Sequence, residues 1–269
     1  MEADCLVDSR VARARLAALN RRERTADEPA GECARRLAER IEGLRVPPGL
    51  VLDAGCGAQP GQMAGAVLKR EVIGIDWCAQ LLPGGAVAAD IAALPFADAS
   101  FGSVWCNLCL PWVANPPQAL AELRRVLAAG GLCLIATLGP DSLQEVRRAF
   151  SDERPHTMGF LDLHDLGDML MACGFAEPVI EAETFTFEYP DGRRLLAELS
   201  GWGALAAPGM HKALTGRATL AAAAAALAPA GVASLTFEVI FAHAWAVPKR
   251  PAKFPDVWQP IAFPGADVR

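Results

Sequence analysis

The sequence predicts an α/β fold in which a mostly parallel sheet, covered by helices on both faces, ends in an antiparallel edge hairpin. Short continuous apolar runs alternate with amphipathic helical stretches through most of the chain, which is typical of parallel strands buried on both faces. Two longer C-terminal runs alternate apolar and polar residues, which indicates strands with one buried face. At 269 residues, 52% of them hydrophobic, the chain is long enough for one sizeable core.

Five apolar runs are the predicted parallel strands, and the first three end in an aspartate. They are Leu50–Asp53, Val72–Asp76, Val87–Asp90, Phe101–Cys106 and Leu132–Leu138, the last preceded by a Gly130–Gly131 turn. The predicted helices between and after them are Gln62–Arg70, Pro117 to Ala128, Asp141 to Phe150 and Leu163–Cys173. Gly174 follows the last of these at the position where a glycine commonly ends a helix.

The hairpin is predicted from period-two runs at Thr184–Tyr189 and Thr236–Val247. Residues 191–231 between them read as a helical insertion containing the alanine-rich helix Ala218–Ala228. Residues 6–45 read as helix, broken near Asp27–Gly31. We therefore expect a helical N-terminal segment, residues 1–48, and one main domain, residues 49–269.

Composition excludes several function classes. The net charge of −6 and pI near 5.3 argue against nucleic-acid binding by the surface as a whole. No run reaches the roughly 18 apolar residues of a membrane span, and the N-terminus lacks the apolar segment of a secretory signal. The eight cysteines are scattered, as in a reduced, cytoplasmic protein. Cys106 and Cys109 form a CxxC without a second ligand pair, so no metal site is expected.

The strongest motif is V-L-D-A-G-C-G, residues 51–57, where a first strand should meet a first helix. Ligands of open α/β sheets bind beyond the carboxyl ends of the strands, and glycine lets the backbone approach them closely. A carboxylate at Asp76 can accept both hydroxyls of a ribose, and one at Asp90 can accept an adenine amino group while apolar neighbours sandwich the ring. The predicted adenosine-binding residues are Asp53, Gly55, Gly57, Asp76, Trp77, Asp90, Ile91 and Asn107.

Each of these features also has an ordinary structural interpretation, as a tight turn or a helix cap. Three of them on successive strands favour a ligand site. A nicotinamide cofactor is the poorer alternative, because its G-x-G-x-x-G fingerprint is replaced here by G-C-G-A-Q-P-G.

Together, Val51–Gly57, Asp76, Asp90–Phe96 and Phe101–Trp112 resemble the class I S-adenosylmethionine (SAM) methyltransferases. More narrowly, the chain is similar to malonyl-acyl carrier protein O-methyltransferases of the BioC type over residues 6 to 263. The motifs that carry this resemblance are Thr137–Leu143, Asp152–His156, the run around Asp165–Gly174, Leu214–Arg217 and Phe241–Trp245.

The resemblance implies a Rossmann-like seven-stranded sheet, an N-terminal lid, SAM as cofactor, and a cytoplasmic monomer acting in biotin synthesis. It implies methyl transfer to the free carboxylate of malonyl-acyl carrier protein or malonyl-CoA. That carboxylate is already ionised near neutral pH, so no general base is expected. Asn107 and Trp112 would line the methyl-transfer region, and Arg154 and His156 would contact the malonyl end; the alternative for these last two is a solvated loop.

Some residues differ from the family pattern and keep two alternatives open. Ala58-Gln59-Pro60 delays the third glycine of the loop to Gly61, and Glu23 stands where relatives carry an aromatic residue in the lid. The chain could methylate another small carboxylate or thioester, or it could be a non-catalytic relative that binds a protein partner. The arginines between residues 10 and 24 would suit an acidic carrier protein, or simply form a solvated helix face.

Overall fold

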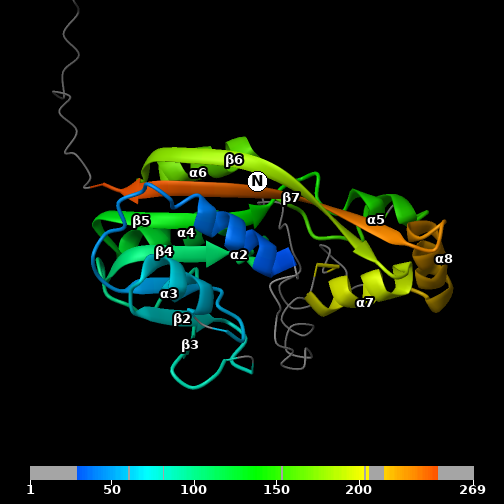
Figure 1. Cartoon of the computed structure of the whole chain (residues 1–269), viewed down its shortest axis with the longest axis horizontal. Helices are drawn as coiled ribbons and strands as arrows, with labels where there is room; N and C mark the ends of the chain where they lie inside the picture. Colours follow the sequence, from blue (N-terminus) through cyan, green and yellow to red (C-terminus); the bar gives the residue numbers. More distant parts are fainter. Residues whose placement is uncertain are drawn as a thin grey trace, which may run out of the picture.

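A computed structural model describes residues 29–59, 61–80, 82–152, 154–202, 204–205 and 215–247. The expectations for the basic N-terminal arginines and for Glu23 lie outside these residues. The described strands form one seven-stranded sheet in the order β3-β2-β1-β4-β5-β7-β6 (Figure 1). The predicted α/β fold, a mostly parallel sheet with an antiparallel edge, is confirmed.

The parallel part of the sheet has five strands, of which the central ones are buried on both faces. It comprises β1 (Val51–Ala54), β2 (Val72–Asp76), β3 (Val87–Ala88), β4 (Phe101–Asn107) and β5 (Leu127–Leu138). β1 lies between β2 and β4 and is parallel to both, so the carboxyl ends of these three strands meet at one edge. Every residue of β1, and every residue of β4 except Asn107, is buried, which explains why both strands are mostly apolar; Asp53 and Ser103 are the buried polar exceptions.

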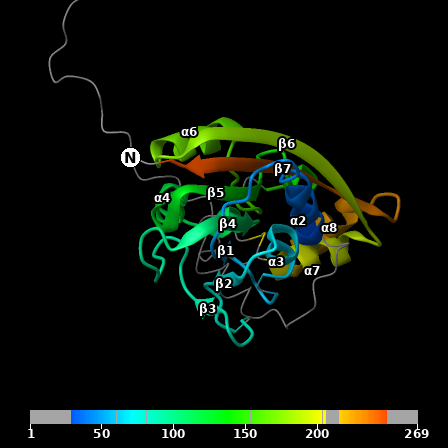
Figure 2. The ribbon, with the colours of Figure 1, turned by 60° about the vertical axis from the view of Figure 1, so that its left-hand side comes forward.

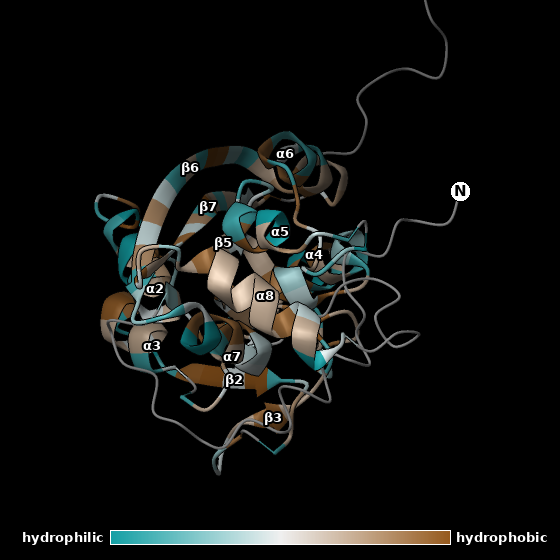
Figure 3. Cartoon of the chain, turned by 90° about the vertical axis from the view of Figure 1, so that its right-hand side faces the viewer, coloured by the Kyte–Doolittle hydropathy of each residue, from teal (hydrophilic) through white to brown (hydrophobic). Residues whose placement is uncertain are grey.

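The antiparallel edge is formed by β6 (Ala176–Tyr189) and β7 (Ala233–Ala246), which pair with each other, while β7 also pairs antiparallel with β5. The predicted hairpin is therefore confirmed, with longer strands than expected. Between β6 and β7 the chain forms α7 (Gly192–Trp202) and α8 (Arg217–Leu227). Figure 3 shows α7, α8 and the short helix α5 (Gln144–Ala149) gathered at the end of the molecule where β6 ends and β7 begins.

Helices cover both faces of the sheet, as Figure 2 shows. On one face Leu37 of α2 (Pro29–Glu39), Leu68 of α3 (Gln62–Leu68) and Leu195 of α7 join a single apolar core. On the other, Leu120 of α4 (Pro116–Val126) and Leu166 of α6 (Leu163–Ala172) join a second core. No helix among the described residues is long and apolar enough to cross a bilayer.

Helix starts follow local chemistry. At α4, the Asn115 side chain accepts a hydrogen bond from the Gln118 backbone N–H at 3.2 Å, and Pro116 occupies the first helical position. At α6, Asp162 accepts a hydrogen bond from the backbone N–H of His164 at 2.8 Å. These caps place the two helices within one or two residues of their predicted starts.

Several predicted boundaries were wrong. The helix expected from Asp141 starts only at Gln144, because the backbone N–H groups of Gly139 and Leu143 donate to β7 and Leu143 is left-handed (φ 59°). The helix expected to reach residue 45 ends at Glu39, and tight turns lead to Gly43, whose φ is 85°.

Two strand predictions also needed correction. The third strand is only Val87–Ala88, because Asp90 enters a turn in which its Oδ1 accepts from the Ala92 N–H at 2.9 Å. Gly130 and Gly131 fall within β5, at an irregularity where the pairing register between β4 and β5 shifts.

Candidate active site

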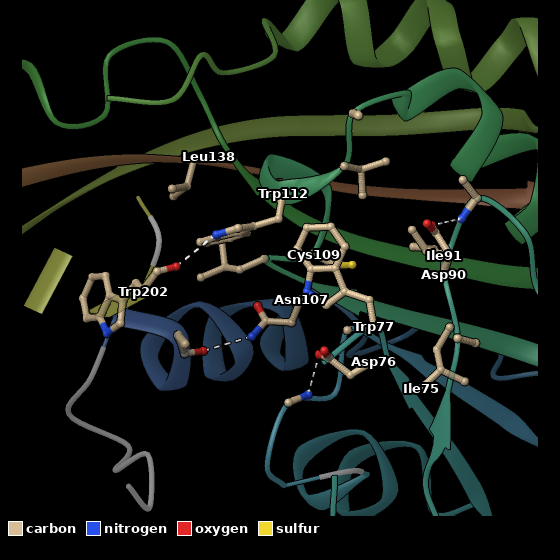
Figure 4. A pocket seen from close by; sticks show the side chains of 18 of the residues that line it. Ile75, Asp76, Trp77, Asp90, Ile91, Asn107, Cys109, Trp112, Leu138 and Trp202 are labelled. Carbon is tan, nitrogen blue, oxygen red and sulfur yellow. Dashed lines mark hydrogen bonds between the residues drawn. The ribbon is translucent and has the colours of Figure 1, made fainter. Parts of the chain in front are cut away.

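A cavity of about 430 Å³ lies at the carboxyl ends of β1, β2 and β4, within the size range of small-molecule sites (Figure 4). Seven of the eight predicted adenosine-binding residues line it. They are Gly55, Gly57, Asp76, Trp77, Asp90, Ile91 and Asn107, and the predicted catalytic residue Trp112 lies with them. The structure thus brings together most of the residues that the strand-end pattern selected.

The eighth residue, Asp53, holds the glycine loop rather than lining the cavity. Its side chain is 8% exposed, and its Oδ2 accepts a hydrogen bond from the Gly61 N–H at 2.7 Å. Burial is the main cause that raises the pKa of this carboxyl to about 6, against the opposing Gly61 hydrogen bond. The delayed third glycine is therefore used to satisfy a buried carboxyl, and Ala58 and Gln59 do not line the cavity.

Gly55 and Gly57 serve the loop in different ways. Gly55 has φ 79°, and a Cβ there would lie 2.7 Å from the Sγ of Cys109, so only glycine fits. Gly57 has φ 59°, and a Cβ there would meet no atom within 4 Å. The first glycine allows close packing within the protein, whereas the second leaves open space beside the cavity that it lines.

Asp76 is fixed by the backbone around it. Its Oδ2 accepts from the Gly57 N–H at 3.1 Å and its Oδ1 from the Cys78 N–H at 2.8 Å. The carboxylate is thereby tied to the glycine loop.

Two hydrogen bonds attach helices to the end of β4 and the turn after it (dashed lines in Figure 4). Asn107 Nδ2 donates to the Ala30 carbonyl of α2 at 3.0 Å, and Trp112 Nε1 donates to the Trp202 carbonyl at the end of α7 at 3.0 Å. The first bond fixes the Asn107 amide, whose buried Oδ1 has no hydrogen-bond partner among the described residues. α2 and α7 thus close the cavity from two sides.

The sequence did not identify Ala30, Cys109, Trp202 or Phe237 as lining residues. They come from four separate elements, and no spacing in the chain signals that they meet. A hydrogen bond with Cys106, together with burial, raises the pKa of the Cys109 thiol, so it stays protonated and is a poor nucleophile. Among the described residues, no group of three or more metal-binding side chains is present.

Arg154 and His156 do not lie in this cavity. They line a second one, of about 510 Å³, formed by the start of α5 and the segment after it. His156 is 5% exposed, stacks on Phe150 with ring centroids 3.6 Å apart, and shares a hydrogen bond of 2.5 Å with Asp152. The four predicted catalytic residues are therefore divided, two and two, between the cavities.

The first cavity suits an adenosine-containing methyl donor. The Asp76 and Asp90 carboxylates stand at the ends of successive strands, and Ile75, Ile91 and Trp77 supply apolar surface beside them. The space beside Gly57, which a side chain would fill, lets a ligand approach the loop backbone. These features fit SAM: the carboxylates suit its ribose hydroxyls and adenine amino group, the apolar surface suits its adenine ring, and the space beside Gly57 suits a part of SAM that approaches the loop backbone.

Comparisons with known proteins agree with this geometry. A family model for a methyltransferase domain matches residues 52–135. A solved structure of a putative methyltransferase from Bacillus halodurans superposes with a TM-score of 0.52 at 20% identity, covering 81% of this chain and all of that one. At this identity the likeness shows the fold alone.

Curated relatives are closer in sequence. The malonyl-[acyl-carrier protein] O-methyltransferase of Gallionella capsiferriformans is 38% identical over 239 residues, 80% of this chain and 82% of the relative. Its counterpart from Methylovorus is 35% identical over 259 residues, 86% of each chain. With a donor cavity at the strand ends and this similarity along most of its length, the chain belongs to the malonyl-[acyl-carrier protein] O-methyltransferase family and is a SAM-dependent methyltransferase.

Proposed function

We propose that this enzyme transfers a methyl group from SAM to the free carboxylate of malonyl-acyl carrier protein, or of malonyl-CoA, as a step of biotin synthesis. The observation that carries the proposal is the 38% identity to a malonyl-[acyl-carrier protein] O-methyltransferase over 80% of the chain. The cavity beside Asp76 and Trp112 supports it, because α2 and α7 close it on two sides and the reaction needs water to be excluded next to the methyl donor.

For the donor, we assign the ribose hydroxyls to Asp76 and the adenine amino group to Asp90, with Ile91 and Trp77 against the ring. Gly55 and Gly57 let the loop backbone approach the donor, and Asp53 holds that loop in place through Gly61. Asn107 and Trp112 line the region where the methyl group is transferred. When bound, SAM supplies an electrophilic sulfonium methyl group.

The acceptor carboxylate needs no general base, because an ordinary carboxyl is ionised at neutral pH. In the methyl transfer a carboxylate oxygen forms a bond to the methyl carbon, the carbon–sulfur bond breaks, and its electron pair remains on sulfur. The protein contributes alignment and exclusion of water. α2 and α7, tied to Asn107 and Trp112, close the cavity and perform both tasks.

The direct test incubates the purified full chain with SAM and malonyl-acyl carrier protein and measures the carrier protein by mass spectrometry. One added methyl group on the malonyl moiety is expected, and no mass change without SAM. Acetyl-acyl carrier protein is the matched control, since it lacks the free carboxylate and should gain nothing.

Calorimetric titration with SAM separates the alternatives. Donor binding without transfer to the malonyl thioester would reject the proposed acceptor and favour another small carboxylate or thioester. Absence of donor binding at millimolar concentration would contradict catalysis and favour a protein-binding role.

A further inference from the structure

The second cavity is cationic within an acidic protein. The whole chain carries a net charge of −6. The described residues that line the second cavity include Arg147 and Arg154 against a single acid, Asp152, a balance of +1 with His156 neutral. A local excess of positive charge in a concave site favours an anionic ligand.

Arg154 is held in one orientation by its neighbours. Its Nε and one Nη donate to Asp152 Oδ2 at 3.1 and 2.9 Å, while the other oxygen of Asp152 contacts His156. His156 is buried and stacked on Phe150, so this chain of contacts is anchored in the protein. The remaining Nη of Arg154 has no hydrogen-bond partner among the described residues, and the side chain is 51% exposed.

Arg147 is fixed in a different way. Its guanidinium donates to the carbonyls of Ser142 and Pro140 at 2.6 and 2.8 Å, which places its charge on the wall of the cavity. Two preoriented guanidinium groups are the usual protein partners of a phosphate.

The two cavities share a wall. Met158 lines the second cavity and packs against Trp77 and Trp112, which line the first. Its N–H donates to the Ala204 carbonyl at 3.1 Å, and Ala204 also lines the first cavity. A flexible ligand that crosses Met158 would therefore have one end in each cavity.

We propose that the second cavity binds the phosphate of the phosphopantetheine arm that carries the acyl thioester, with Arg154 and Arg147 as its partners. The inference rests on the proposed function. The acceptor carboxylate must reach the methyl donor in the first cavity, so it cannot also lie at Arg154. The phosphate is the other charged group of such an arm, and the neutral amides between them suit the polar and apolar wall of Thr157 and Met158. This assigns Arg154 and His156 to the distal part of the acceptor instead of its malonyl end, with His156 a positioning residue.

The experiment compares two small acceptors, malonyl-phosphopantetheine and malonyl-pantetheine, which differ only in the phosphate. The wild-type enzyme is expected to use the phosphorylated thioester with a kcat/KM higher by about tenfold or more, carried mainly by KM. In Arg154→Gln this preference should fall to about twofold or less. Arg154→Lys should retain part of it, because charge remains but the paired hydrogen-bonding geometry is lost.

Arg148→Gln is the matched control. Arg148 lies on the same helix as Arg147 and bonds to Gln144, but it does not line the cavity, so the preference should remain that of the wild type. Circular dichroism checks that each variant is folded.

Each result has a definite meaning. Equal use of both thioesters by the wild type, or a preference that survives in Arg154→Gln, would overturn the inference while leaving the methyltransferase function in place. Absence of methyl transfer to either thioester would overturn the proposed function, and this inference with it.

Discussion

The two cavities of this enzyme are built by different means. The first takes its polar groups from the ends of hydrogen-bonded parallel strands, where register fixes the Asp76 and Asn107 backbones. The second takes most of its polar groups from the segment after α5, where Asp152, Arg154 and His156 position one another through side-chain contacts, and adds Arg147 from α5 itself. A strand-end site is fixed by the whole sheet, whereas the segment site depends on a few local contacts.

The largest expected effect breaks the strand-end site. Asp76→Ala removes the two acceptors of the Gly57 and Cys78 N–H groups and the proposed partner of the ribose. The dissociation constant for SAM, measured by calorimetric titration, should rise about 100-fold, since each hydrogen bond to a charged group is worth about 1.5–3 kcal/mol.

Asp98→Ala is its control, because that carboxylate is 78% exposed and pairs with Arg125 at the surface. Its SAM affinity should match that of the wild type. If the dissociation constant for SAM rose less than fivefold in Asp76→Ala, the Asp76 carboxylate would not be the partner of the ribose.

A pair of glycine variants separates packing from ligand space within the same loop. Gly55→Ala should lower the free energy of unfolding by about 3 kcal/mol, because a left-handed backbone is combined with a contact to Cys109. Gly57→Ala should cost only about 1 kcal/mol, since its Cβ meets no atom within 4 Å, yet it should weaken SAM binding about tenfold.

Urea unfolding and titration on both proteins provide the check. Equal loss of stability, or unchanged SAM binding in Gly57→Ala, would contradict the distinction between the two glycines.

The sequence predicted the first cavity well because its residues follow the strands. An acid or amide at the carboxyl end of a parallel strand lies at that edge of the sheet whatever the loops do, as Asp76 and Asn107 do; Asp90 reaches the same cavity from the turn after β3. Asp53 was placed at the same edge, but its role in holding Gly61 depends on how the loop folds back.

The second cavity itself was not predicted. The family resemblance selected Arg154 and His156, but no sequence spacing fixes where a segment between two helices lies. Stacking on Phe150 sets the position of His156. The wall between the two cavities is set by the packing of Met158 against Trp77, which is distant in the sequence. Contacts of α7 with the cavity, such as that of Trp202, were missed for the same reason.

A pH series sharpens the account of the strand-end site. The Asp53 carboxyl has a pKa of about 6, above the ordinary value of 3.8, so the folded state binds this proton more tightly than the unfolded state. Its contribution to stability is therefore complete below pH 4 and is lost as pH rises to 6. Asp53→Asn stays neutral and still accepts from the Gly61 N–H.

The stability of Asp53→Asn relative to wild type should consequently rise between pH 4 and 6, by about 2–3 kcal/mol, and then level off. Urea unfolding from pH 4 to 8 measures it. A difference independent of pH, or one that falls across this range, would show that the carboxyl is not buried as described.

The smallest effect concerns the link between the two cavities, since Trp112 lines the first and packs against Met158 of the second. Trp112→Phe keeps an aromatic ring but removes the hydrogen bond to the Trp202 carbonyl, worth about 1 kcal/mol. We expect kcat/KM for the malonyl thioester to fall about fivefold, because the lost hydrogen bond fixes Trp112 in the proposed methyl-transfer region. The SAM dissociation constant should change less than twofold, because the proposed ribose and adenine contacts of Asp76 and Asp90 are untouched. Trp202→Phe is the matched variant, since a backbone carbonyl survives the substitution and the hydrogen bond with it. If Trp112→Phe weakened SAM binding as much as it weakened acceptor use, the Trp112–α7 contact would support the donor as well as the acceptor, and the assignment of Trp112 to the methyl-transfer region alone would be wrong.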